Sequence, residues 1–343
     1  MNIKTEQIHN GWKCFHITND HGMRVSILNY GGIIKEMLVP DKWGKLENVV
    51  LGYQNIEDYQ RNSHFLGAII GRVAGRIQDA SFKLNGNTYF LDTNDGENCL
   101  HSGSGGLHSV IWNADPFKAA DKAGVKLTYT SPDNKGGFPG NVDIAVTYSL
   151  NNDNKLMINY EAISDKTTAF TLTNHSYFNL SGNLKDTIKQ HLVKINSSYF
   201  AELHQNLIPT GNILDVSNTP FDFRYGQELS TGIESGLEQN TIAGNGYDHY
   251  FLFDQNQGNI IVKESSSGRV MEIETNQPGM IMYTASNLEK GLTLKEGLSQ
   301  KYAGVCFETQ GSPASLHHEN FPSIVLKANT LYSKQTSFTF GAE

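Results

Sequence analysis

Alternation of apolar and polar residues is the clearest pattern in this chain. Apolar residues occupy every second position from Val142 to Leu150, and the pattern resumes at Leu156 after a turn-rich Asn-Asn-Asp-Asn segment. A period of two is typical of a β-strand with one buried face. The two runs therefore predict an antiparallel hairpin over residues 142–162.

Further strands are predicted along the chain, whereas helical periodicity is scarce. Asn85-Gly86 separates the short runs 81–84 and 88–91, and this dipeptide supplies the positive φ angles of a tight hairpin turn. Residues 271–275 and 338–340 alternate in the same way, and only Asn55–Tyr59 fits a helical turn or two. We therefore expect a mostly β protein, a large antiparallel β-sandwich with few short helices. Without an evident linker or repeat, residues 1–343 are expected to form one domain.

Composition and charge exclude several classes of partner. Lys and Arg total 27 against 35 Asp and Glu, a net charge of -8, and no basic cluster would follow a phosphate backbone. The amino-terminal residues contain no apolar signal core, and no apolar run is long enough to cross a bilayer. We therefore expect a cytoplasmic protein with neither nucleic acid nor membrane as a partner. The three cysteines are widely spaced, which favours reduced, structural thiols over a disulfide framework.

The common cofactor motifs are absent from the sequence. It contains no Gly-rich phosphate loop, no complete dinucleotide-binding turn and no serine in a nucleophile elbow. His317 and His318 are adjacent, which would point their rings apart on a strand and make them poor metal ligands. We therefore expect no cofactor and no resident metal.

His175 is the first candidate for chemistry. It stands in the β-patterned run 170–180, and a strand would hold its imidazole in a fixed direction. Histidine is the side chain whose ordinary pKa lies nearest neutrality, so it suits a proton donor. The structural alternative is a buried histidine that is satisfied by a backbone partner.

Four other segments place polar residues in apolar or glycine-rich surroundings. Each has a structural alternative, since an arginine can pair with a carboxylate, a histidine can cap a loop, an aspartate can organise a turn and a glutamate can face solvent. The segments are residues 71–77 with Arg76, 98–103 with His101, 246–249 with Asp248, and 305–310 with Glu308.

Together these segments resemble the aldose 1-epimerase family, and the resemblance spans nearly the whole chain in the family's order. It implies a galactose mutarotase-type β-sandwich with an open cleft, and interconversion of the α and β anomers of a free aldose without metal or nucleotide. The matching motifs are Gly71-Arg72-Val73-Ala74, Arg76-Ile77, Leu100-His101, Thr173-Asn174-His175-Ser176-Tyr177-Phe178-Asn179-Leu180, Tyr247-Asp248-His249 and Glu308-Thr309-Gln310.

The resemblance also implies roles for individual residues. Glu308 corresponds to the general base at the anomeric hydroxyl and His175 to the general acid at the ring oxygen, and we expect them on different sides of the sugar. Nearby carboxylates would keep His175 charged. His101, Arg76 and Asp248 match sugar-binding residues, and Tyr283 matches an aromatic ring beside the sugar.

One departure from the family pattern bears on the site, and several functions stay open. Gly75 stands where many relatives have Asn, which would remove one hydrogen bond to the sugar. The alternatives are a hexose-6-phosphate 1-epimerase, a glycoside hydrolase with Asp248 and Glu308 as paired carboxylates, and a non-catalytic carbohydrate-binding protein. The preferred sugar (glucose, galactose or maltose) and the oligomeric state are left open.

Overall fold

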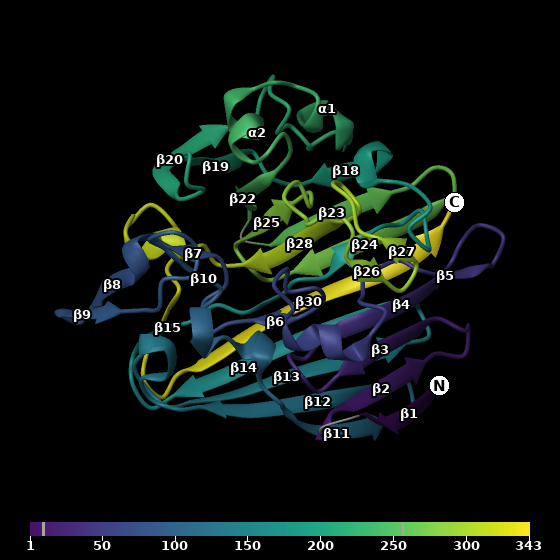
Figure 1. Cartoon of the computed structure of the whole chain (residues 1–343), viewed down its shortest axis with the longest axis horizontal. Coiled ribbons are helices and arrows are strands. Elements are labelled where there is room, and N and C mark those ends of the chain that lie inside the picture. The colour runs from purple at the N-terminus through teal and green to yellow at the C-terminus, as the bar shows by residue number, and fades with distance from the viewer. Residues whose placement is uncertain (9–10, 256) are drawn as a thin grey trace.

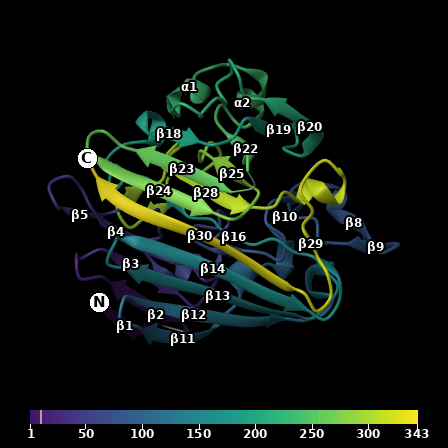
Figure 2. The same cartoon turned by 180° about the vertical axis from the view of Figure 1, so that it is seen from behind.

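Antiparallel strands dominate the architecture (Figure 1). The structure is a computed structural model and describes residues 1–8, 11–255 and 257–343. Its largest sheet crosses the whole molecule (Figure 2). In spatial order its nine strands are β11 (Asn113–Lys118), β12 (Lys122–Ser131), β13 (Val142–Asn151), β14 (Lys155–Ser164), β30 (Leu331–Ala342), β24 (Arg269–Thr275), β23 (Gly258–Lys263), β18 (Leu192–Ile195) and β21 (Gln227–Glu228).

The smaller sheets complete the sandwich. A five-stranded sheet contains β1 (Asn2–Gln7), β2 (Lys13–Thr18), β3 (Arg24–Leu28), β4 (Ile34–Pro40) and β5 (Leu46–Asn48). A six-stranded sheet has the order β17 (Tyr177–Phe178), β28 (Val305–Gln310), β25 (Gly279–Tyr283), β22 (Asp248–Leu252), β19 (Tyr199–Leu203) and β20 (Pro209–Asp215). Two-stranded pairs are β7 (Arg76–Ile77) with β10 (Cys99–Leu100), β8 (Ser81–Leu84) with β9 (Asn87–Phe90), β6 (Ile69–Ile70) with β16 (Thr173–Asn174), β15 (Thr168–Ala169) with β29 (Val325–Leu326), and β26 (Thr293–Leu294) with β27 (Gly297–Leu298).

Helices are short throughout the part of the chain that the structure describes. The α-helices are α1 (Ser230–Ile233) and α2 (Glu238–Ile242), and no described helix has the length and apolar character to span a membrane. The 3-10 helices are η2 (Ile56–Gln60), η3 (Gln78–Ala80), η4 (Gly103–Gly105), η5 (Leu107–Ser109), η6 (Lys135–Gly137), η7 (Ile188–Gln190) and η8 (Pro313–Leu316).

The predicted strand patterns are confirmed. β13 and β14 pair from Val142 with Ser164 to Leu150 with Leu156, so the predicted hairpin is present. The turn between β8 and β9 has φ values of 51° at Asn85 and 80° at Gly86, as expected for Asn-Gly. The helical turn expected near residues 55–59 is η2.

A continuous apolar core lies among the sheets. It joins residues from the beginning of the chain, such as Phe15 on β2, to residues from its end, such as Phe340 on β30. Burial of this apolar surface is the main favourable contribution to folding. On β28, Val305 and Phe307 belong to this core. Because strand side chains alternate, Cys306 and Glu308 point to the opposite face of the six-stranded sheet.

Candidate active site

All six residues selected from the sequence line one cavity. Three of them lie on strands of the six-stranded sheet and one lies on β7, while His101 follows β10 directly and His175 lies two residues before β17. The six are Arg76, His101, His175, Asp248, Tyr283 and Glu308. Segments that are far apart in the sequence therefore form one site.

The strand order explains how the site is assembled. β17, β28, β25 and β22 are consecutive neighbours, and each contributes at least one residue to the cavity wall. Asp248 pairs with Tyr283 across β22 and β25, and Ile281 pairs with Glu308 across β25 and β28. Glu308 is only 3% exposed, so the alternative of a solvated glutamate on an outer strand face does not apply.

His175 does not lie in the middle of a strand, which corrects the sequence interpretation. It occupies a two-residue break between β16 and β17. Its amide donates to Ala68 O at 2.9 Å, and its carbonyl accepts from Gly67 N at 3.0 Å. These two hydrogen bonds to the residues just before β6 fix the backbone at His175 although it lies outside a strand.

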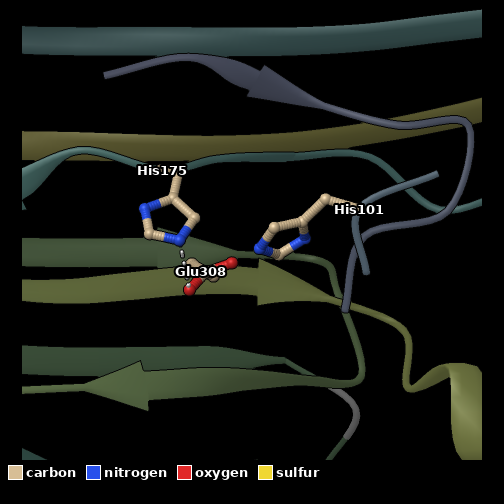
Figure 3. A group of neighbouring side chains, drawn as sticks. All are labelled: His101, His175 and Glu308. Carbon is tan, nitrogen blue, oxygen red and sulfur yellow. Dashed lines mark ion pairs between the residues drawn. The ribbon is translucent and has the colours of Figure 1, made fainter. Parts of the chain in front are cut away.

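His175 and Glu308 are in direct contact (Figure 3). The distance between His175 Nε2 and Glu308 Oε1 is 3.3 Å, and both side chains are buried. No sugar ring fits between atoms this close together. The expectation that the acid and the base lie on different sides of the sugar is therefore wrong, because both belong to one wall of the cavity.

Burial controls the charge of this pair. It lowers the pKa of His175 to about 3 and raises the pKa of Glu308 well above its usual range. The expectation that carboxylates keep His175 charged is therefore wrong, because desolvation is the largest effect on the pKa of its imidazole and neighbouring cationic groups lower the pKa further. Burial of the pair therefore favours a neutral imidazole beside a protonated carboxyl.

Glu308 Oε2 has no hydrogen-bond partner in the described part of the chain. This oxygen is also buried. An unpaired buried acceptor is costly unless a ligand supplies the missing donor. A hydroxyl group bound in the cavity would supply it.

His101 enters the cavity from the opposite side, just after β10. Its ring and that of His175 are nearly perpendicular, with centroids 5.3 Å apart. Its backbone has a positive φ of 53°, and its amide donates to Gly75 O at 3.0 Å. Burial lowers the pKa of His101 well below its usual range, so this imidazole is neutral.

Arg76 links two carboxylates at the cavity. Its Nε donates to Asp95 Oδ2 at 2.7 Å, and its Nη1 donates to Asp248 Oδ2 at 3.3 Å. Burial opposes the charge on Arg76, but Asp248 and Asp95 together raise the pKa of the guanidinium. Asp95 was missed in the sequence because it lies in a polar loop that resembles an ordinary turn.

Aromatic rings form much of the remaining wall. Tyr283 lies 6.5 Å from His175 between ring centroids, and Tyr177 lies 5.1 Å from it. Phe65, a residue that sequence reasoning missed, is 4.7 Å from His101 and 5.9 Å from His175. Its φ of 56° is unusual for a bulky residue, a feature that often marks functional sites.

Two residues of the 71–77 segment have structural explanations. Arg72 is buried and donates hydrogen bonds to the segments around Ser131 and Pro139 rather than to the cavity. Gly75 has a φ of 89°, and an added Cβ would lie 3.0 Å from Pro313 Cγ and 3.2 Å from Gln310 Nε2. An asparagine at this position would therefore require a local shift.

The three cysteines are buried free thiols, as the sequence predicted. One of them contacts the site, because Cys306 Sγ lies 3.5 Å from His175 Nδ1. Burial raises the pKa of this thiol well above its usual range, so it stays protonated.

Comparisons with known proteins identify the family of this chain. Residues 13–339 match the family model described as Aldose 1-epimerase. The chain is 36% identical to a pig (Sus scrofa) protein named galactose mutarotase, over 95% of this chain and 93% of the relative. It is 34% identical to an aldose 1-epimerase of Streptococcus thermophilus, over 94% of this chain and 92% of the relative.

A solved structure of galactose 1-epimerase from Lactobacillus acidophilus NCFM superimposes with a TM-score of 0.88 and 28% identity, covering 99% of this chain and 98% of that one. The galactose mutarotase-type fold expected from the sequence is thereby confirmed. The chain belongs to the aldose 1-epimerase family of isomerases.

Proposed function

We propose that this protein interconverts the α and β anomers of a free aldose, with Glu308 as the general base and His175 as the general acid. The contact of 3.3 Å between His175 Nε2 and Glu308 Oε1, at the wall of a cavity, carries the proposal. It places a carboxylate and an imidazole where one sugar can reach both. The names of the pig and Streptococcus thermophilus relatives support the same reaction.

The reaction needs two proton transfers in each direction. Glu308 takes the proton of the anomeric hydroxyl, and His175 gives a proton to the ring oxygen as the bond between that oxygen and C1 breaks. The open-chain aldehyde then rotates about its C1–C2 bond. Return of the proton from Glu308 to O1 and of the ring-hydroxyl proton to His175 closes the ring with either configuration.

The pair alternates between two forms that share one transferable proton. Before ring opening the pair is a carboxylate beside an imidazolium, and after ring opening it is a carboxylic acid beside a neutral imidazole. The burial that disfavours both charges therefore favours the ring-opening step. Burial favours the proton on Glu308, and the contact of 3.3 Å with His175 gives that proton a direct path to the imidazole.

The other residues are proposed to bind the sugar. Arg76 and Asp248 offer a donor and an acceptor for hydroxyl groups, and His101 offers a donor near the ring oxygen. Tyr283 supplies an apolar surface for the C–H groups of the ring. We also propose that residues 1–343 act as one domain, which the continuous core from Phe15 to Phe340 supports.

A hexose-6-phosphate 1-epimerase ranks second. A phosphate group requires cationic side chains that are free to bind it. Arg76 is the only cationic lysine or arginine side chain among the described residues that line the cavity. It is already paired with Asp95 and Asp248. This arrangement favours an uncharged sugar.

Polarimetry on freshly dissolved α-anomers tests the proposal. Glucose, galactose, xylose, maltose and glucose 6-phosphate should be compared with and without enzyme. Faster approach to the same equilibrium rotation is the expected result, and the ranking of rates identifies the preferred sugar. Binding without acceleration would indicate a carbohydrate-binding protein, and a new reducing end released from a glycoside would indicate a hydrolase.

A further inference from the structure

Three side chains of the cavity have the composition of a metal site. His101, His175 and Glu308 each offer a ligand atom, and these atoms lie within 4.8 Å of one another (Figure 3). Two imidazoles and a carboxylate are a common ligand set for zinc and iron. Proximity alone therefore suggests a divalent cation, so the protonation of each ring has to be considered.

The main chain determines the protonation of His101. Gly75 N donates a hydrogen bond to His101 Nδ1 at 3.0 Å. A backbone amide is always a donor, so Nδ1 must present its lone pair. A neutral imidazole carries one N–H, which is then on Nε2.

This tautomer is the wrong one for metal binding. A histidine that ligates through Nε2 must carry its proton on Nδ1, where a carbonyl or carboxylate usually accepts it. At His101 that proton would face the hydrogen of the Gly75 amide. Ligation would therefore break the contact at 3.0 Å and leave two donors opposed.

The contact is well anchored, because it is reciprocal. His101 N donates to Gly75 O at 3.0 Å, so the two residues hold each other through main chain and side chain. Gly75 adopts a φ of 89°, a conformation in which glycine is favoured, and an added Cβ would crowd Pro313 and Gln310. The position therefore suits glycine, whose main chain forms the hydrogen bonds with His101 and which has no side chain to crowd the site.

We propose that the amide of Gly75 is a positioning group that fixes His101 as a neutral Nε2–H donor and closes the His101–His175–Glu308 cluster to divalent cations. The inference deepens the proposed function, in which this N–H donates to the sugar. It also explains how a cavity with two imidazoles and a carboxylate stays available to sugar when divalent metal ions are present.

The same contact implies that His101 does not become charged. The titratable or charged groups around it are His175, His108, Arg76 and Glu308. A second proton would have to enter at Nδ1, against the Gly75 amide. His101 is therefore expected to keep one tautomer across the pH range in which an ordinary histidine titrates.

NMR of the full-length, sugar-free protein tests the tautomer directly. Long-range proton–nitrogen correlation spectra separate protonated from unprotonated ring nitrogens, and His101→Asn identifies the signals of residue 101 by their loss. Asparagine tolerates the positive φ of this position, so the variant is expected to fold. The expected result is a protonated Nε2 and an unprotonated Nδ1 from pH 5 to pH 8. A proton on Nδ1, alone or together with Nε2, would overturn the proposal.

Calorimetric titration with zinc chloride provides the second readout. Wild type and His101→Asn should show the same zinc binding, because residue 101 supplies no ligand in either protein. One equivalent of zinc that binds wild type and is lost in His101→Asn would contradict the inference. Neither measurement depends on turnover, so failure of this inference is distinguishable from failure of the proposed reaction.

Discussion

Asp95 binds Arg76 more closely than Asp248 does, at 2.7 Å against 3.3 Å. The loop carboxylate therefore sets the direction of the guanidinium that reaches the cavity. Asp248, the partner that lines the cavity, is left with the weaker contact and keeps capacity to accept a hydrogen bond from a sugar hydroxyl.

Asp95→Asn should impair sugar binding more than chemistry. Loss of the charge-assisted bond lets Arg76 pull Asp248 away from the sugar, so we expect KM to rise by about 3- to 10-fold with a smaller change in kcat. Steady-state polarimetry separates the two constants. Asp79→Asn is the matched control, because it lies in the same region at a φ of 52° that asparagine tolerates. A fall in kcat alone would contradict this role.

Removal of either proton-transfer group should leave a folded but nearly inactive protein. Glu308→Gln and His175→Asn each keep most of the side-chain volume, and each is expected to slow anomerisation by about 100- to 10,000-fold. Circular dichroism checks the fold, and polarimetry on α-galactose or α-glucose measures the rate. Glu289→Gln and His317→Asn, both exposed, serve as controls. A near-wild-type rate in either variant would remove that residue from the proposed mechanism.

Two substitutions of Phe65 can separate the effect of its strained backbone from the effect of its aromatic ring. At a φ of 56°, the Cβ of alanine is destabilised by steric repulsion in the left-handed region, whereas glycine has no Cβ and is not. Phe65→Gly should therefore be more stable than Phe65→Ala by about 1 kcal/mol, the reverse of the usual order, as measured by urea unfolding. Both variants should lose activity, because the ring contacts His101 and His175. Equal stability of the two variants would argue against strain at this position.

A buried ion pair far from the cavity should govern acid stability. Burial opposes the charge of Glu47, but hydrogen bonds from Lys185, Lys45 and Arg269 lower the pKa of its carboxyl to about 2. A depressed pKa stabilises the fold above the unfolded value of about 4.3, and this contribution is lost as the pH falls toward 2.

Glu47→Gln should lower the free energy of unfolding by about 3–5 kcal/mol near pH 7, because the guanidinium of Arg269 is left buried without its carboxylate partner. The difference from wild type should shrink as the pH falls from about 5 toward 2. Urea unfolding at a series of pH values measures this difference. A difference in the free energy of unfolding that stays constant over this pH range would show that the ionised carboxylate of Glu47 is not the source of the stability.

The sequence predicted part of the strands, and its resemblance to the family selected the six cavity residues, but neither pointed to Asp95 or Phe65. Alternation identifies β13 and β14 because strand side chains have a period of two. Asp95 and Phe65 lie in loops, where no periodicity marks a residue whose partner is supplied by the fold. The charge of His175 was also misjudged, because desolvation depends on how much protein surrounds the ring.

The register between β28 and β25 determines which side of the sheet Glu308 faces. Glu308 opposite Ile281 faces the cavity, while Phe307 opposite Met282 faces the interior. A slip of one residue would send the carboxylate into the apolar core and the phenyl ring into the cavity. The position of Glu308 is thus constrained by the packing beneath it, whereas the loops around the cavity are free of this constraint and can change without displacing the carboxylate.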